Sequence, residues 1–208
     1  MFELHKEGVK LWYEPGSRPT APRVKHSPKV HVYLGVTWYG PTEPIFVAGG
    51  SKKSNFTSPD GKSAMRGVGA AEYNENVLPK LITDGNDLFA GNRTLARSWI
   101  FQQDNALAHT AKTNKGFLND HLPGRWIQDW PACSPDLSWI ENVWAWAEHQ
   151  LNLLRQSIQS ASDPIAELQT AVSKILSDLP RDMCQKYVAS MMGRMQKVVS
   201  VGGAQIDK

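Results

Sequence analysis

The stretch SWIFQQDNALAHTAKTNKGFL, residues 98–118, passes from a short apolar run through an acidic residue into a segment with helical spacing. It predicts a short buried strand over residues 98–104, which ends at Asp104, and a helix over residues 109–118. Residues 126–130 predict another short strand. A strand, a helix and a strand in succession are typical of a mixed α/β domain.

The segments that precede this stretch extend the prediction. Residues 30–38 alternate apolar and polar side chains with a period of two, which predicts a strand. Shorter β-like stretches at residues 9–13 and 45–47 favour an antiparallel meander. Residues 49–69 are poor in apolar side chains, and we interpret them as a solvated loop rather than a DNA-contacting one. Apolar spacing over residues 73–82 predicts one helix.

Three helices are predicted in the rest of the chain. The most regular has an apolar face running from Ile140 to Leu154. The second begins at Asp163 and Pro164, a cap and first-turn pair. The last carries a methionine stripe that we interpret as core filling rather than a ligand set. The side chains expected to face inward are Ile165, Leu168, Val172, Ile175 and Leu179 in the second helix, and Tyr187, Val188, Met191, Met195 and Val198 in the last.

Length and composition fit one packed domain. The chain has 208 residues, of which 41% are hydrophobic, and it contains 8 tryptophans. We expect residues 1–160 to form the core and residues 161–208 to add helices that pack on the same domain. The formal net charge of +3 permits a nucleic-acid partner without requiring one.

Other classes of protein fit the sequence poorly. Cys133 and Cys184 stand in unrelated contexts, which excludes a disulfide framework and a zinc ligand set built from cysteines. The first residues are too charged for a signal peptide, and no apolar run approaches the length of a membrane span. We therefore expect a soluble, intracellular protein.

Asp104 and Glu141 are the candidate metal-binding residues. Phosphoryl transfer on nucleic acids commonly uses divalent cations, and magnesium prefers oxygen ligands, so carboxylates from distant elements suit such a site. Each residue also has a structural interpretation. Ser138 and Glu141 match a capping box, and Asp104 can close a turn after a strand. The acidic pair alone favours the structural interpretation over the chemical one.

The motifs around this pair are more specific. The sequence QQDNALAHT, residues 102–110, resembles the second catalytic block of Tc/mariner transposases. The sequence WPACSPDLSWIENVW, residues 130–144, resembles the family's block around its catalytic glutamate. Residues 32–40 and 73–81 resemble a core strand and the first core helix, and residues 188–203 resemble the C-terminal helix with the two glycines that follow it.

This resemblance implies a ribonuclease H-like fold, in which helices flank a mixed sheet. It implies a DDE endonuclease that cleaves DNA and transfers strands, as DNA transposition and integration require. Asp104 and Glu141 would be catalytic and hold Mg²⁺ or Mn²⁺, with Asn105, His109 and Asn142 as supporting neighbours. For His109 and Asn142 a structural role is the favoured interpretation. The resemblance also implies DNA as partner, a homodimer and a nuclear location, with no membrane association.

The chain departs from the family at its beginning. In the family an Asp-Glu pair precedes the phenylalanine that Phe2 matches, which puts the first catalytic aspartate before Met1. Glu3 is a poor substitute because side chains alternate faces along a strand. We therefore expect most of the first, central strand to be missing and the chain as given to be inactive. The alternative is a non-catalytic remnant or adopted domain that binds nucleic acid or a protein partner.

Overall fold

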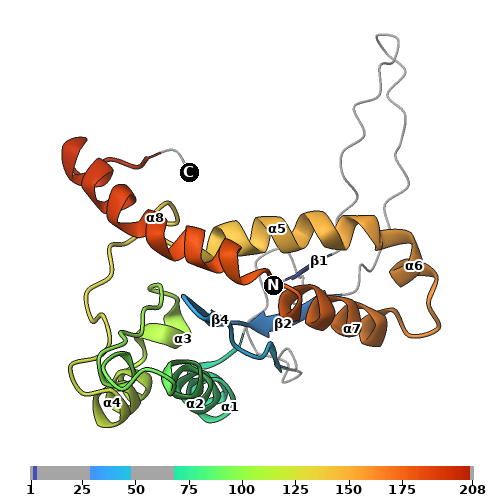
Figure 1. Cartoon of the computed structure of the whole chain (residues 1–208). Helices are drawn as coiled ribbons and strands as arrows, with labels where there is room; N and C mark the ends of the chain where they lie inside the picture. The colour runs from blue at the N-terminus through green and yellow to red at the C-terminus, as the bar shows by residue number, and fades with distance from the viewer. Residues whose placement is uncertain (1, 4–28, 48–67, 207–208) are drawn as a thin grey trace, which may run out of the picture.

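The structure is a computed structural model that describes residues 2–3, 29–47 and 68–206. Strands β1 (Phe2–Glu3), β2 (Lys29–Tyr33) and β5 (Ile45–Val47) form an antiparallel sheet in the order β1-β2-β5. Strands β3 (Val36–Thr37) and β4 (Gly40–Pro41) pair as a separate hairpin (Figure 1). The strand predicted at residues 9–13 and nearly all of the loop predicted at residues 49–69 lie outside the described residues.

The predicted strand over residues 30–38 is divided between β2 and β3. Its period of two is confirmed, because Val30, Val32 and Leu34 are buried. The division falls at Gly35, whose carbonyl accepts a 2.8 Å hydrogen bond from the Thr42 amide and whose amide donates a 2.9 Å bond to Thr42 Oγ1. A Cβ atom at Gly35 would lie 2.8 Å from Thr42 Cγ2, so this close approach of two chain segments requires glycine.

The strands predicted at residues 98–104 and 126–130 are reduced to one parallel bridge between Phe101 and Trp126. The Phe101 amide donates to the Arg125 carbonyl over 2.8 Å, and the Ile127 amide donates to the Phe101 carbonyl over 3.0 Å. A longer strand would need a second neighbouring strand, or more residue pairs between the Phe101 and Trp126 segments. Within the described residues no strand pairs with the other side of the Phe101 segment.

The predicted helix over residues 73–82 is two helices, α1 (Ala70–Asn76) and α2 (Leu78–Phe89), which meet at Val77. Pro79 explains the break, because it lacks the N–H that would donate to the carbonyl four residues earlier. After the short 3₁₀ helix η1 (Leu95–Arg97), the predicted helix over residues 109–118 is also divided, into α3 (Leu107–Thr110) and α4 (Lys112–His121). Ala111, with φ −57° and ψ 139°, separates these two.

Four helices complete the fold: α5 (Ile140–Leu153), α6 (Arg155–Ser160), α7 (Pro164–Ser177) and α8 (Arg181–Ser200). The predicted cap of α7 is confirmed, since the Asp163 side chain accepts from the amides of Ile165 and Ala166. No helix within the described residues is long and apolar enough to cross a membrane.

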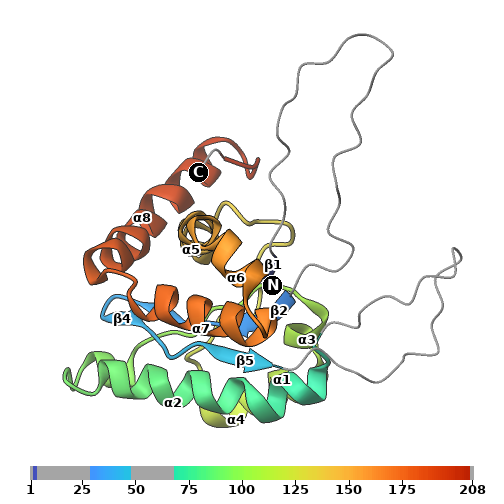
Figure 2. The ribbon, with the colours of Figure 1, turned by 90° about the vertical axis from the view of Figure 1, so that its right-hand side faces the viewer.

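Helices cover both faces of the three-stranded sheet (Figure 2). Val32 of β2 and Phe46 of β5 pack with α5, α7 and α8 on one face. Ile45 and Val47 of β5 pack with α1, α2 and α4 on the other. The sheet therefore lies between two hydrophobic layers, and the prediction of a mixed α/β fold is confirmed.

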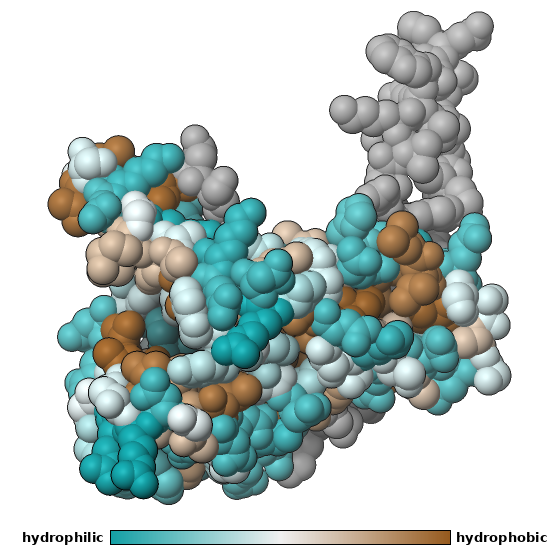
Figure 3. All heavy atoms as spheres, viewed as in Figure 1, coloured by the Kyte–Doolittle hydropathy of each residue, from teal (hydrophilic) through white to brown (hydrophobic). Residues whose placement is uncertain are grey.

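The C-terminal helices differ from the prediction in two places. In α7 the expected inward residues are buried except Ile165, which is 52% exposed. In α8 Met195 is 49% and Val199 79% exposed, so the interpretation of the methionine stripe as core filling is wrong for this part of the helix. The cause is that α8 runs on past the body of the molecule, where Figure 3 shows hydrophobic side chains at its end. Helical spacing identified an apolar face without showing what covers it.

Candidate active site

Asp104 lies in the loop between the Phe101 bridge and α3, with its side chain 63% exposed. Its Oδ1 atom accepts a 3.1 Å hydrogen bond from the Ala106 amide and lies 2.6 Å from His109 Nδ1. A carboxylate can only accept, so the imidazole donates from this nitrogen. The hydrogen bond from His109 is the main reason that the pKa of Asp104 lies below its ordinary value, against the opposing effect of burial. Asp104 is therefore ionised at neutral pH.

His109 is held in an aromatic setting. Its ring centroid lies 4.5 Å from that of Tyr73 and 6.4 Å from that of Tyr33, and its side chain is only 15% exposed. The Tyr73 hydroxyl donates to Gln103 Oε1 over 2.8 Å, and Gln103 Nε2 donates to the His109 carbonyl over 3.2 Å. Burial is the main cause that raises the pKa of both tyrosines, which keeps these hydroxyls protonated. The network fixes the imidazole that orients Asp104.

Asn114 is a support that the sequence analysis missed. It is fully buried on α4, and its Nδ2 atom donates to the carbonyl of Ala70 over 3.0 Å and to that of Ala108 over 2.6 Å. These bonds tie α3, and with it His109, to the start of α1. The only sign of this role in the sequence is that Asn114 is a polar residue on the inward face of the helix predicted over residues 109–118.

Asn105 joins the two segments that resemble the family's catalytic blocks. Its Nδ2 atom donates a 2.7 Å hydrogen bond to the carbonyl of Trp130, where the second matching segment begins. The loop that carries Asp104 is thereby tied to the chain that leads to α5.

Glu141 is the second residue of α5 and is half-buried. The capping box predicted for Ser138 and Glu141 is absent, because Trp139 occupies the cap position and makes no side-chain cap bond. Glu141 thus lies one residue too close to the helix start for that role. Its carboxylate forms no hydrogen bond or ion pair with any described residue, so its oxygens are free for another ligand.

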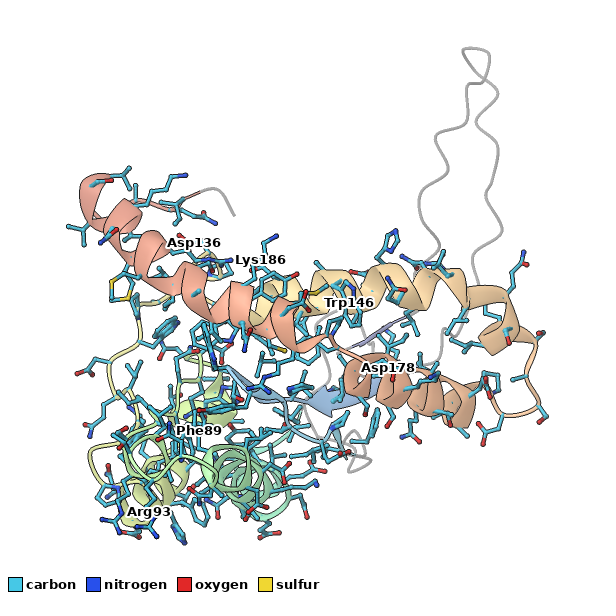
Figure 4. All side chains as sticks on the ribbon, viewed as in Figure 1. Phe89, Arg93, Asp136, Trp146, Asp178 and Lys186 are labelled. Atoms are coloured by element: carbon cyan, nitrogen blue, oxygen red, sulfur yellow. The ribbon has the colours of Figure 1, made fainter. Side chains whose placement is uncertain are left out.

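The helix start beside Glu141 is bonded to α8. Arg194 Nη2 donates to Asn142 Oδ1 over 2.7 Å, and Nη1 donates to the Asp136 carbonyl over 2.8 Å. The Asp136 side chain is 3% exposed, and its Oδ2 atom accepts from the Ile206 amide over 3.0 Å. Figure 4 shows Asp136 beside α8. The sequence did not identify Arg194 or Asp136 as residues that support the helix start beside Glu141.

The described residues bring Asp104 and Glu141 into no direct contact, and they contain no group of three or more His, Cys, Asp or Glu residues that could hold a metal ion. The chemistry of the two carboxylates nevertheless fits a hard cation, since both present oxygens without a described partner. A shallow hollow of about 480 Å³ lies elsewhere on the described surface, between Phe46 and Lys174. Neither Asp104 nor Glu141 lines this hollow.

Known sequences match the part of the chain that contains both Asp104 and Glu141. The family described as DDE superfamily endonuclease matches residues 62–163. The Tcb1 transposase of Caenorhabditis briggsae is 34% identical over 111 residues, which is 52% of this chain and 37% of that protein. The Tc3 transposase of Caenorhabditis elegans is 27% identical over 111 residues, 53% of this chain and 32% of that protein. The chain thus spans well under half the length of these relatives.

Comparison with solved structures agrees with the fold. A pre-cleavage Mos1 transpososome matches with a TM-score of 0.64 and 17% identity, over 96% of this chain and 52% of that one. The Mos1 transposase catalytic domain, solved with raltegravir and Mg, matches with a TM-score of 0.55 and 16% identity, over 86% and 77% of the two chains. The predicted ribonuclease H-like fold is confirmed. Residues 62–163 thus match the DDE superfamily endonuclease family, and sequence and fold together support a Tc/mariner DDE transposase catalytic domain.

Proposed function

We propose that Asp104 and Glu141 are two of the carboxylates that hold a divalent cation for DNA cleavage and strand transfer. The observation that carries this proposal is the ionised, 63% exposed carboxylate of Asp104, oriented by His109 at 2.6 Å. The unbonded carboxylate of Glu141 at the start of α5 supports it. So do two matching structures of the Mos1 transposase catalytic domain, one solved with Mg and the other with Mn.

The residues of this chain would act mainly by position. His109 restricts the Asp104 side chain, so that one oxygen is engaged and the other stays available. Glu141 projects from the first turn of a helix that is packed against the sheet through Val143 and Ala147. Mg²⁺ or Mn²⁺ held between such carboxylates would neutralise charge on the reacting phosphate and lower the pKa of water.

The proposed substrate is DNA at the ends of a transposon, acted on in the nucleus. Solved Mos1 structures that match this fold include paired-end and strand transfer complexes. Two joined ends suggest that two protein copies act together, and we propose a homodimer on this ground. The reaction would be hydrolysis of a phosphodiester, which frees a 3′ hydroxyl, and then attack of that hydroxyl on target DNA with loss of the target's own 3′ oxygen as leaving group.

The cation site is tested by calorimetric titration of Mn²⁺ into the 208-residue chain. The double variant Asp104→Asn, Glu141→Gln should lose the binding that the wild type shows. The matched control is Asp120→Asn, Glu148→Gln, which changes one exposed acidic residue on α4 and one on α5. Equal binding by wild type and the Asp104, Glu141 variant would contradict the proposal.

Cleavage is tested with labelled duplexes that carry the terminal sequences flanking the gene. We compare the chain as it stands with a version that has an Asp-Glu pair placed directly before Phe2, where β1 begins beside β2. The family resemblance predicts Mn²⁺-dependent cleavage only by the second version, lost again with Asp104→Asn. Specific DNA binding without cleavage by either version would favour the non-catalytic alternative.

A further inference from the structure

We propose that Arg194 and the amide of Ile206 form a C-terminal clamp that positions Glu141 for cation binding. Both groups bond the segment from Asp136 to Asn142, which leads into α5 and contains Glu141. The role assigned to Glu141 rests on the proposed function, whereas the clamp itself is a structural device that can be measured separately.

The start of α5 needs such support because it has no side-chain cap of its own. Trp139, at the cap position, has φ −67° and ψ −18° and cannot accept a bond from the first helical amides. At the start of α7, by contrast, Asp163 accepts from two backbone amides. The segment before α5 is also fixed by few bonds of its own, chiefly 3.2 Å turns from the Leu137 and Ser138 amides to Ser134 and Pro135.

Arg194 supplies the missing support through geometry rather than charge. Its three donor nitrogens bond three uncharged acceptors: the Asp136 carbonyl, Asn142 Oδ1, and Ser190 Oγ at 3.1 Å. The planar guanidinium fixes the directions of these bonds, and a lysine ammonium cannot reproduce them. Asn142 follows Glu141 directly, so the guanidinium holds the same helical turn that presents the carboxylate.

The chain after α8 supplies the second contact. Gly202, with φ 67°, and Gly203, with φ 86°, adopt left-handed backbone conformations that turn the chain back toward the body. Ile206 is then 8% exposed, and its amide reaches Oδ2 of Asp136. A buried carboxylate is costly unless it accepts hydrogen bonds, so this amide stabilises the folded position of Asp136.

A metal site tolerates only small displacements of its ligands. Carboxylate ligands must be held within about 0.5 Å of the productive geometry, and residues that orient ligands affect cation affinity about 10-fold or more. Without the clamp, the first turn of α5 would fray while the rest of the helix stays packed. Arg194 is thus a positioning residue for Glu141.

The test measures Mn²⁺ affinity and hydrogen exchange on the full 208-residue chain carrying Arg194→Lys. We expect Mn²⁺ affinity to fall about 10-fold and exchange at the amides of residues 140–142 to rise by a similar factor. Exchange at Ala106 should not change. The matched control is Arg181→Lys, on the same helix, where the guanidinium lies over the Tyr39 ring at 5.3 Å and not at α5.

Asn142→Ala should repeat the loss, and adding it to Arg194→Lys should cost little more, because both remove the same bond. Gly203→Val strains the turn and should produce a smaller loss in the same direction. A thermal melt with wild-type cooperativity checks that each variant folds.

Three results decide between the proposals. Unchanged exchange at residues 140–142 in Arg194→Lys would overturn the clamp. Faster exchange with unchanged Mn²⁺ affinity would overturn its role in positioning Glu141. If the wild type binds no Mn²⁺, the proposed function fails, and the exchange measurement alone then confirms or overturns the clamp.

Discussion

The two segments that resemble catalytic blocks, residues 102–110 around Asp104 and residues 130–144 around Glu141, are held in different ways. Asp104 is oriented by residues close to it in sequence, since Ala106 and His109 lie 2 and 5 residues away. The start of α5, with Glu141, is bonded to Arg194 at separations of 52 and 58 residues, and Asp136 is bonded to Ile206 at 70. The first block therefore carries most of its own support, whereas the second depends on the C-terminal end of the fold.

This difference has a consequence for mutation. A substitution in the first block should affect only residues close to it, unless it removes a bond to a buried residue such as Asn114. Damage to the C-terminal helix should reach a candidate catalytic carboxylate far away in sequence.

The largest effect is expected where the first block meets the core. Asn114→Leu removes the buried donor that bonds two carbonyls, those of Ala70 and Ala108, and puts a larger side chain in its place. Each lost bond costs about 0.5–1.5 kcal/mol and overpacking adds about 1–3 kcal/mol, so the free energy of unfolding in urea should fall by about 2–4 kcal/mol. The nearby Lys112→Ala, at an exposed position on the same helix, should change it by about 0.5 kcal/mol or less. Similar values for both variants would show that Asn114 does not hold α3 in place.

The next effect concerns the second block. Arg194→Met removes hydrogen bonds from a charged donor and should lower the free energy of unfolding by about 1.5–3 kcal/mol. Combined with His109→Phe, the two losses should add to within about 0.5 kcal/mol, because His109 and Arg194 share no hydrogen-bond partner among the described residues. Chemical denaturation of the two single variants and the double variant measures this. A coupling well above that limit would show that the two blocks are one unit.

A smaller effect is expected at the start of α7, which has the local cap that α5 lacks. Asp163→Ala should lower the free energy of unfolding by about 1 kcal/mol through loss of two accepted amide bonds. Ser162→Ala, next to it and exposed, is the control and should have little effect. A negligible change in Asp163→Ala would mean that tertiary packing alone fixes this helix start as well.

The smallest effect on stability is expected at His109. Replacing it with Phe keeps a ring against Tyr73 but removes the hydrogen bond to Asp104, so the pKa of Asp104 should rise toward its ordinary value. A lowered native pKa contributes stability that is present above the unfolded pKa of an aspartate and is lost as the pH falls through the native value. In acid, the free energy of unfolding of His109→Phe should therefore change less with pH than that of the wild type. Carboxyl ¹³C shifts of Asp104 between pH 2 and pH 6, beside a His121→Phe control, measure the pKa change.

The sequence predicted local features well and distant contacts poorly. Apolar periodicity found β2 and α5, and the Asp163 cap was found because its signal lies within three residues. The breaks at Val77 and Ala111 were missed, because the apolar spacing continues through them while the backbone does not. Pro79 was the available signal for the first break.

The candidate site shows the same limit. The motif around Asp104 contains its own partner His109, so sequence alone placed both residues near each other. Arg194 and Ile206 gave no such signal, because nothing local indicates which segment a distant arginine or a chain end will contact. The apolar stripe of α8 was misinterpreted for a related reason, since exposure depends on neighbours that periodicity does not reveal.

The most direct test asks whether the two blocks bind one ion. Mn²⁺ is titrated into isotope-labelled protein, and paramagnetic broadening is followed at the amides of Ala106 and Asn142. If Asp104 and Glu141 share a cation, both signals broaden with the same midpoint, and Asp104→Asn shifts both midpoints together. Broadening at only one amide, or two unrelated midpoints, would contradict a shared site and with it the proposed chemistry of this domain.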